Sequence, residues 1–309
     1  MGILEELSER VSAIADRLGG SVVRIGGGWR GGSGFIIGDG LVLTNAHNVR
    51  REQVHVLFAD GRRAAATLKG VDVDGDLAVL AVDTAGAPAV EWATGEARLG
   101  TTVLGVALSG GGGARVTVGW VSAAARPFRG PHGRRIAGAL EHTAPLAPGS
   151  SGGPLTDSEG RVLGINTNRI GTGFYLALPA DEALQARIAA LARGQSPRRP
   201  RLGVAIAPGH AARAMRRAVG LPEQDGLLVR EVEDGSPAAA AGIAEGDLLV
   251  TAAGRALADA DDLYDALGGV GDGGSLALTV LRGSVERTVS VSFADGEAAD
   301  GAGAEGPVH

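Results

Sequence analysis

Apolar residues recur near the start of the chain at alternating steps of three and four. They are Leu4, Leu7, Val11, Ile14 and Leu18. This spacing places one apolar stripe along the side of a helix. We therefore expect a helix over residues 3–18, and we expect it to pack on its own domain rather than against a second subunit.

From Ser21 to about Leu178 the pattern changes to short apolar runs separated by Gly and Asp, which are common turn residues. The runs are Ser21–Ile25, Phe35–Ile37, Leu41–Thr44, Val54–Phe58, Leu77–Ala81, Thr102–Val106, Val116–Val121, Val162–Asn166 and Phe174–Ala177. Many short strands with frequent turns predict an all-β barrel or sandwich. A helix is expected next, over Ala180–Ala192, where apolar residues again repeat at helical spacing.

A polar, basic segment with two prolines, residues 193–200, separates two sets of predicted strands and is typical of a linker. Residues 201–293 contain further strand-like runs and two helical stretches near 211–219 and 260–267. Residues 294–309 are mostly Gly, Ala and acidic residues, which favours a disordered tail. The expected units are an N-terminal helix (1–20), a strand-rich domain (21–192), a linker (193–200), a second domain (201–293) and a tail (294–309).

Composition narrows the class of protein. The chain is 44% hydrophobic, as in globular proteins, and its formal charge of -6 gives no electrostatic reason to expect nucleic-acid binding. It has no cysteine, so disulfides and thiolate metal sites are excluded while the redox compartment stays open. Neither an export signal nor a membrane span is recognisable, so a cytoplasmic location is expected, unless an export signal was trimmed.

The segment Pro148–Leu155, which reads PGSSGGPL, carries the first chemical signal. A serine nucleophile needs an exposed hydroxyl and nearby amides aimed at the developing oxyanion, and flanking glycines leave such amides uncovered. Ser151 is the candidate nucleophile. The candidate oxyanion loop is Gly149, Ser150 and Ser151, with the amides of Gly149 and Ser151 as donors. Taken alone, the segment could also be a plain glycine-rich turn.

A serine nucleophile requires a base, and the base requires an acceptor that orients it. His47 follows a predicted strand, where a loop could present its imidazole to a cleft. Asp76 directly precedes the apolar run Leu77–Ala81, which places its carboxylate near the interior. His142 lies nine residues before Ser151 and is interpreted as a packed or solvent-facing histidine. The order His, Asp, Ser matches that of chymotrypsin-like barrels.

The chain also resembles the HtrA/Deg family of serine proteases over residues 21–293. The blocks that carry the resemblance are Gly32–Phe35, Leu43–His47, Asp76–Leu80, Gly119–Ala123, Gly149–Leu155 and Gly164–Thr167. The resemblance implies a mainly β fold, a chymotrypsin-like double β-barrel followed by a C-terminal PDZ domain. It assigns His47 as general base, Asp76 as its orienting partner and Ser151 as nucleophile, with no metal or organic cofactor.

Specificity and peptide binding are also implied by the resemblance. The expected substrate pocket consists of Pro145, Leu146, Asn166 and Thr167, and the lack of an acid there favours small or medium aliphatic P1 residues over basic ones. Residues 201–293 resemble a bacterial PDZ domain, through Gly226–Val229, Gly235–Ala238 and Gly246–Val250. PDZ domains bind an extended peptide by strand addition and hold its terminal carboxylate on backbone amides. The implied groove is Arg201, Leu202, Gly203, Val204, Ala205 and Ile206.

The expected function is therefore ATP-independent cleavage of unfolded or damaged proteins by a homotrimer, with C-terminal peptides as partners of the PDZ groove. Residues 142–147 read HTAPLA, where the family usually has TDAAIN. This departure leaves two alternatives open. One is a chaperone whose protease site is inactive, and the other is a scaffold that uses only its PDZ groove.

Overall fold

The computed structural model describes residues 2–26, 31–49, 53–109, 112–129, 135–170, 172–197, 200–207, 209–270 and 273–293. The chain forms two compact units, Met1–Pro197 and Arg198–His309. The tail predicted over residues 294–309 lies outside the described residues. None of the helices in the described part of the chain is long and apolar enough to cross a membrane.

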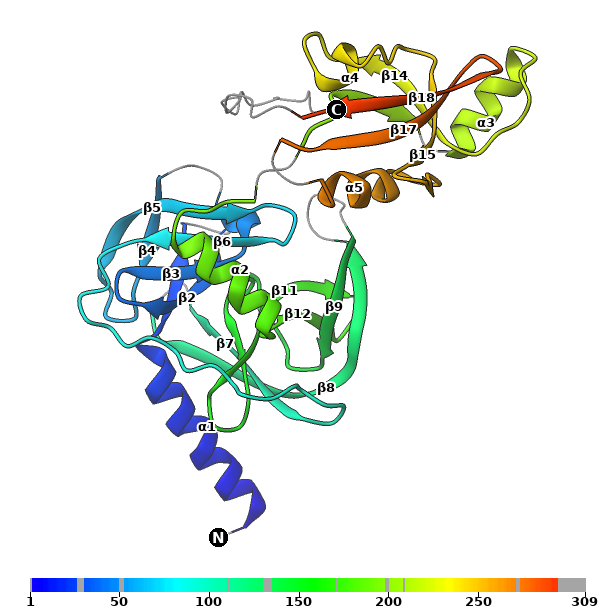
Figure 1. Ribbon diagram of the computed structural model, residues 1–309. Coiled ribbons are helices and arrows are strands. Elements are labelled where there is room, and N and C mark those ends of the chain that lie inside the picture. Colours follow the sequence, from blue (N-terminus) through cyan, green and yellow to red (C-terminus); the bar gives the residue numbers. More distant parts are fainter. Residues whose placement is uncertain are drawn as a thin grey trace, which may run out of the picture. The chain divides into compact units, whose positions relative to one another are not determined.

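The first unit contains two closed six-stranded barrels (Figure 1). The first barrel has the order β1-β2-β3-β6-β5-β4 and the second β10-β11-β12-β9-β8-β7. The strands of the first are β1 (Val22–Ile25), β2 (Gly32–Gly38), β3 (Leu41–Thr44), β4 (Gln53–Leu57), β5 (Arg63–Asp72) and β6 (Leu77–Ala81). Those of the second are β7 (Thr102–Leu108), β8 (Ala114–Arg129), β9 (Arg135–His142), β10 (Pro154–Thr156), β11 (Val162–Ile170) and β12 (Phe174–Pro179). The mainly β double barrel predicted from the sequence is confirmed.

Three strands, β5, β9 and β10, are absent from the sequence-based expectation. The clearest case is β5, whose residues RAAATLKGVD include alanines and a glycine, residue types that are depleted in strands. The strand forms because it pairs with β4 on one side and β6 on the other. Tertiary pairing therefore overrides the local preference.

Two α-helices complete the described part of the first unit. The helix α1 (Ile3–Gly19) extends away from the barrels at its N-terminal end (Figure 1), while Ile14 and Leu18 are buried in the core that both barrels share. The helix α2 (Glu182–Ala192) buries Leu184, Ile188 and Leu191 in the same core. It packs on β5 and β6, next to the start of β6, where Asp76 lies.

The second unit is a twisted sheet with the order β13-β14-β15-β17-β18, and β16 pairs with β15. Its strands are β13 (Val204–Ala207), β14 (Leu227–Val232), β15 (Leu248–Ala252), β16 (Arg255–Ala256), β17 (Ser275–Arg282) and β18 (Val285–Ser292). Its helices are α3 (Gly209–Ala218), α4 (Pro237–Ala240) and α5 (Ala260–Gly268). Residues of β13 and α5 share one apolar core, and β13 is an edge strand of the sheet.

Candidate active site

The two barrels bring the three predicted catalytic residues together. His47 lies in a short 3-10 helix, Ala46–Asn48, that directly follows β3. Asp76 immediately precedes β6, and Ser151 lies in the loop between β9 and β10. The first barrel therefore supplies the imidazole and the carboxylate, and the second supplies the hydroxyl.

The three side chains form a continuous hydrogen-bonded series. His47 Nδ1 lies 2.9 Å from both Oδ1 and Oδ2 of Asp76, and His47 Nε2 lies 2.9 Å from Ser151 Oγ. The Asp76 side chain is fully buried, whereas that of His47 is 26% exposed. A carboxylate that accepts from Nδ1 fixes the tautomer in which Nε2 can take a proton from the hydroxyl. This geometry is the one that base-assisted attack by a serine requires.

The Asp76 carboxylate is held by further donors on both of its oxygens. The backbone N–H of His47 donates to Oδ1 at 3.2 Å, and Thr167 Oγ1 donates to Oδ2 at 2.9 Å. Asn45 Nδ2 donates to the backbone carbonyl of Asp76 at 2.9 Å. These bonds leave the carboxylate little freedom to rotate. Sequence reasoning missed Asn45 in this role and placed Thr167 in the substrate pocket.

The Ser151 hydroxyl has three acceptors within reach. They are His47 Nε2 at 2.9 Å, Asn45 Oδ1 at 2.9 Å and the Thr167 carbonyl at 3.0 Å. A hydroxyl carries one proton, so it donates to one of these acceptors at a time. Asn45 and Thr167 therefore compete with the base for the proton of the nucleophile.

The loop before β10 has the shape of an oxyanion site. Ser33 Oγ donates to the Gly149 carbonyl at 2.7 Å, and the Ser33 amide donates to the Ser151 carbonyl at 2.8 Å. The Ser150 amide donates to the Ala147 carbonyl at 3.0 Å. The amides of Gly149 and Ser151 donate to no acceptor among the described residues. Those two amides are available to an oxyanion, and that of Ser150 is already used.

The residues predicted for the substrate pocket occupy different environments. Pro145 is exposed, and Leu146 is half-buried beside β7, where a Cβ on Gly105 would lie 2.9 Å from its Cδ2. Asn166 is buried and donates from Nδ2 to the Pro154 carbonyl at 3.1 Å. Because the Thr167 side chain binds Asp76, only its carbonyl faces the nucleophile. The pocket assignment stays a prediction.

His142, at the end of β9, is a packed histidine. Its ring is fully buried and stacks on Tyr175, with the ring centroids 5.9 Å apart. Both ring nitrogens and Asn166 Oδ1 are buried without a hydrogen-bond partner in the described part of the chain. Burial lowers the pKa of His142 to about 4, and the Asn166 side chain opposes this shift in part. The ring is therefore neutral near pH 7.

The predicted peptide groove begins at a turn with free amides. Gly203 has φ +78, and a Cβ there would lie 2.2 Å from Ser236 Cβ, so only glycine fits. The carbonyls of Leu202 and Gly203 accept from the amides of Ala238 and Glu233, at 3.0 and 2.9 Å. The amides of Leu202 and Gly203 make no backbone hydrogen bond to any described residue. They precede the edge strand β13, which follows at Val204.

Comparison with known proteins extends these observations. A trypsin-like peptidase domain matches residues 32–165, and a PDZ domain matches residues 200–293. A probable periplasmic serine endoprotease, DegP-like, from Brucella suis is 34% identical over 274 residues, which cover 85% of this chain and 52% of the relative. The putative serine protease HhoA from Synechocystis is 34% identical over 278 residues, which cover 85% of this chain and 70% of the relative. The chain thus spans about half the length of the DegP-like relative.

A solved structure, the HtrA-type protease AlgW with tripeptide, has a TM-score of 0.63 and 28% sequence identity, covering 94% of this chain and 99% of that one. The comparisons also correct one expectation. The cytoplasmic location expected from the sequence is wrong, because the DegP-like relatives are named periplasmic and point to an extracytoplasmic location.

Proposed function

Because the chain belongs to the HtrA/Deg family of serine proteases, we propose that it is an endopeptidase in which Ser151, His47 and Asp76 hydrolyse peptide bonds. The observation that carries this proposal is the unbroken series from Asp76 through His47 to Ser151, with each heavy-atom distance at 2.9 Å. The free amides of Gly149 and Ser151 beside it support the same conclusion.

The geometry supports acyl transfer in two steps. Ser151 Oγ attacks the scissile carbonyl while His47 Nε2 takes its proton, and Asp76 stabilises the imidazolium that forms. The amides of Gly149 and Ser151 donate to the oxyanion of the tetrahedral intermediate. His47 then returns the proton to the leaving amine, and water hydrolyses the acyl-enzyme by the same route in reverse.

We assign unfolded or damaged proteins as the substrates, cleaved without ATP. The P1 pocket is assigned to Pro145 and Leu146, with the strand at Asn166 and Thr167 beside it. Leu146 offers an apolar surface, and no acidic side chain is among these residues. A small or medium aliphatic P1 residue therefore fits better than a basic one.

The second unit is assigned to peptide binding. The edge strand β13 can pair with an extended peptide, while the amides of Leu202, Gly203 and Val204 receive its terminal carboxylate. The AlgW structure, solved with a tripeptide, supports a peptide role for this family.

We also propose that the protein is a homotrimer. Measurement of its size in solution tests this, with the α1-deleted protein as comparison.

Cleavage of casein by the wild-type protein and by Ser151→Ala tests the protease assignment. Removal of a triad residue typically costs about 10⁴- to 10⁶-fold in turnover, so S151A should be inactive. Equal cleavage by both proteins would refute the role of Ser151.

A second function is favoured by the competition for the Ser151 proton: a latent protease that acts as a chaperone or PDZ scaffold until a ligand engages it. This alternative predicts no labelling of Ser151 by a fluorophosphonate without a C-terminal peptide. Rapid labelling in the absence of peptide would exclude it.

A further inference from the structure

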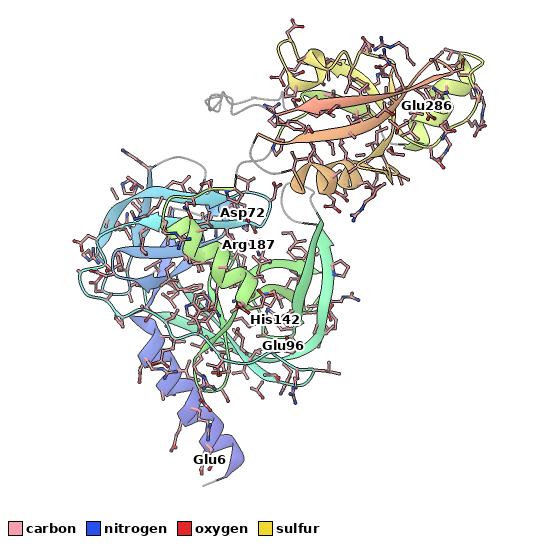
Figure 2. The ribbon with its side chains drawn as sticks, in the orientation of Figure 1. Glu6, Asp72, Glu96, His142, Arg187 and Glu286 are labelled. Carbon is pink, nitrogen blue, oxygen red and sulfur yellow. The ribbon has the colours of Figure 1, made fainter. Side chains whose placement is uncertain are left out.

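The turn that carries Asp76 is fastened to α2, which lies more than a hundred residues later in the chain. Asp72, at the end of β5, is 5% exposed. Its Oδ1 accepts from the Gly75 amide at 2.8 Å, and its Oδ2 lies 3.2 Å from Arg187 Nη1 of α2. Figure 2 labels both residues, Asp72 at the end of the first barrel and Arg187 on α2. One carboxylate thus closes the turn and binds the helix.

This ion pair packs directly on the backbone before Asp76. A Cβ at Gly75 would lie 2.3 Å from Asp72 Oδ2 and 2.5 Å from Arg187 Nη1, so a side chain there would displace the ion pair. Asp76 itself has φ 55, which is uncommon for a residue other than glycine. Such a conformation persists only where surrounding contacts hold it. The Asp72–Arg187 pair lies against Gly75, the residue directly before Asp76.

The segment around the end of α2 makes further contacts with β5. A Cβ at Gly70 would lie 2.5 Å from the Leu191 carbonyl, so the end of the helix rests on the strand backbone. The Val71 amide donates to Ser196 Oγ at 2.9 Å. Among the described residues, pairing of β5 with β4 ends at Thr67, and beyond it α2 and the residues after the helix lie against β5.

We propose that Arg187 is a positioning residue for the triad. Its ion pair with Asp72 holds the β5–β6 turn in the conformation that directs the Asp76 carboxylate at His47 Nδ1. This role rests on the proposed protease function. A misdirected carboxylate no longer fixes the tautomer of the base, which slows the chemical step and leaves substrate binding intact. Small displacements of a catalytic group cost up to about 100-fold in rate.

The test is Arg187→Met, which keeps the apolar stem and removes the guanidinium. Its readouts are kcat and KM for casein cleavage, the rate of Ser151 labelling by a fluorophosphonate, and Tm. We expect kcat and the labelling rate to fall together by roughly 10- to 100-fold with KM unchanged. Arg187→Lys should recover most of the rate. Asp72→Asn, which keeps an oxygen for the Gly75 amide, should reproduce the loss.

Arg161→Met is the matched control, since Arg161 pairs with Asp157 at 2.9 Å and Asp157 also closes its own turn, but that turn carries no triad residue. R161M should lower Tm slightly and leave kcat at the wild-type value. Wild-type kcat in both R187M and D72N, with a Tm loss like that of R161M, would overturn the positioning role. A wild-type protein that neither cleaves casein nor labels, even with a C-terminal peptide present, would overturn the proposed function and this role with it.

Discussion

Acid should destabilise the first unit through His142. The pKa of this histidine is about 4 in the folded protein because its ring is buried, against 6.5 for the exposed side chain. Between these two values the unfolded chain binds more protons than the folded one. The contribution of the neutral His142 ring to the unfolding free energy is therefore fully present above about pH 6.5 and is lost as the pH falls toward 4. The two pKa values differ by about 2.5, which corresponds to about 3 kcal/mol of unfolding free energy.

The assay is urea unfolding at several pH values between 7 and 4, followed by tryptophan fluorescence. All three tryptophans, Trp29, Trp92 and Trp120, belong to the first unit, so the signal reports its unfolding. The comparison is with His142→Phe, which keeps an aromatic ring against Tyr175 and cannot titrate. Carboxylates also titrate in this range, but they contribute equally to both proteins and cancel in the difference.

We expect the unfolding free energy of the wild type to fall relative to that of H142F by about 3 kcal/mol between pH 7 and pH 4. His55→Gln is the control, because His55 is an exposed histidine on β4 of the same unit. The unfolding free energy of H55Q should change with pH in the same way as that of the wild type. A difference between wild type and H142F that does not change with pH would refute the argument from burial.

Three further changes test the site and the peptide groove. Gly152→Ala should abolish casein cleavage, because Gly152 has φ +87 and a Cβ there would lie 2.2 Å from the Ser33 carbonyl of β2. Gly173→Ala is the control: Gly173 has a similar φ of +89 but open space around it, so turnover should stay intact. Thr167→Val should lower kcat by roughly 10- to 100-fold without changing KM, since it removes a hydrogen bond of about 1.5–3 kcal/mol to the triad carboxylate. Gly203→Ala should eliminate binding of a fluorescent C-terminal peptide measured by anisotropy, while Gly235→Ala, which also has positive φ but meets no neighbour, should bind normally.

The sequence predicted the elements whose signals are local. The helix ending near Leu18 and the strand Leu77–Ala81 are found within a residue or two of their expected bounds, because apolar periodicity is a property of neighbouring residues. His47, Asp76 and Ser151 could be proposed from the sequence because each stands in a short segment with a recognisable order along the chain. The strand β5 was missed because its pairing partners, and not its own residues, make it a strand.

The supporting residues of the site could not be read in the same way. Ser33, Asn45 and Thr167 are ordinary polar residues until the barrels close and bring them within 3.0 Å of the triad or its loop. Their roles depend on contacts between residues far apart in sequence, since Ser33 is 116 residues from Gly149 and Thr167 is 91 residues from Asp76. Asp72 shows the same limit. Its bond to the Gly75 amide is local, but its second partner is Arg187, 115 residues away in the sequence.

Because the supporting residues come from distant parts of the chain, substitutions at them should affect the site differently from substitutions in the triad. Replacing a triad residue removes a group that takes part in the chemistry, whereas the supporting residues act through hydrogen bonds that hold the triad and its loop in place. The nucleophile loop receives bonds from Ser33 and Asn48 of the first barrel, and the Asp76 carboxylate receives one from Thr167 of the second. Residues of the first barrel therefore hold the Ser151 loop, which belongs to the second barrel, and Thr167 of the second barrel holds the Asp76 carboxylate of the first. A disturbance of the contact between the barrels should then weaken both groups at once, and losses in kcat from paired substitutions such as S33A and T167V should not simply add.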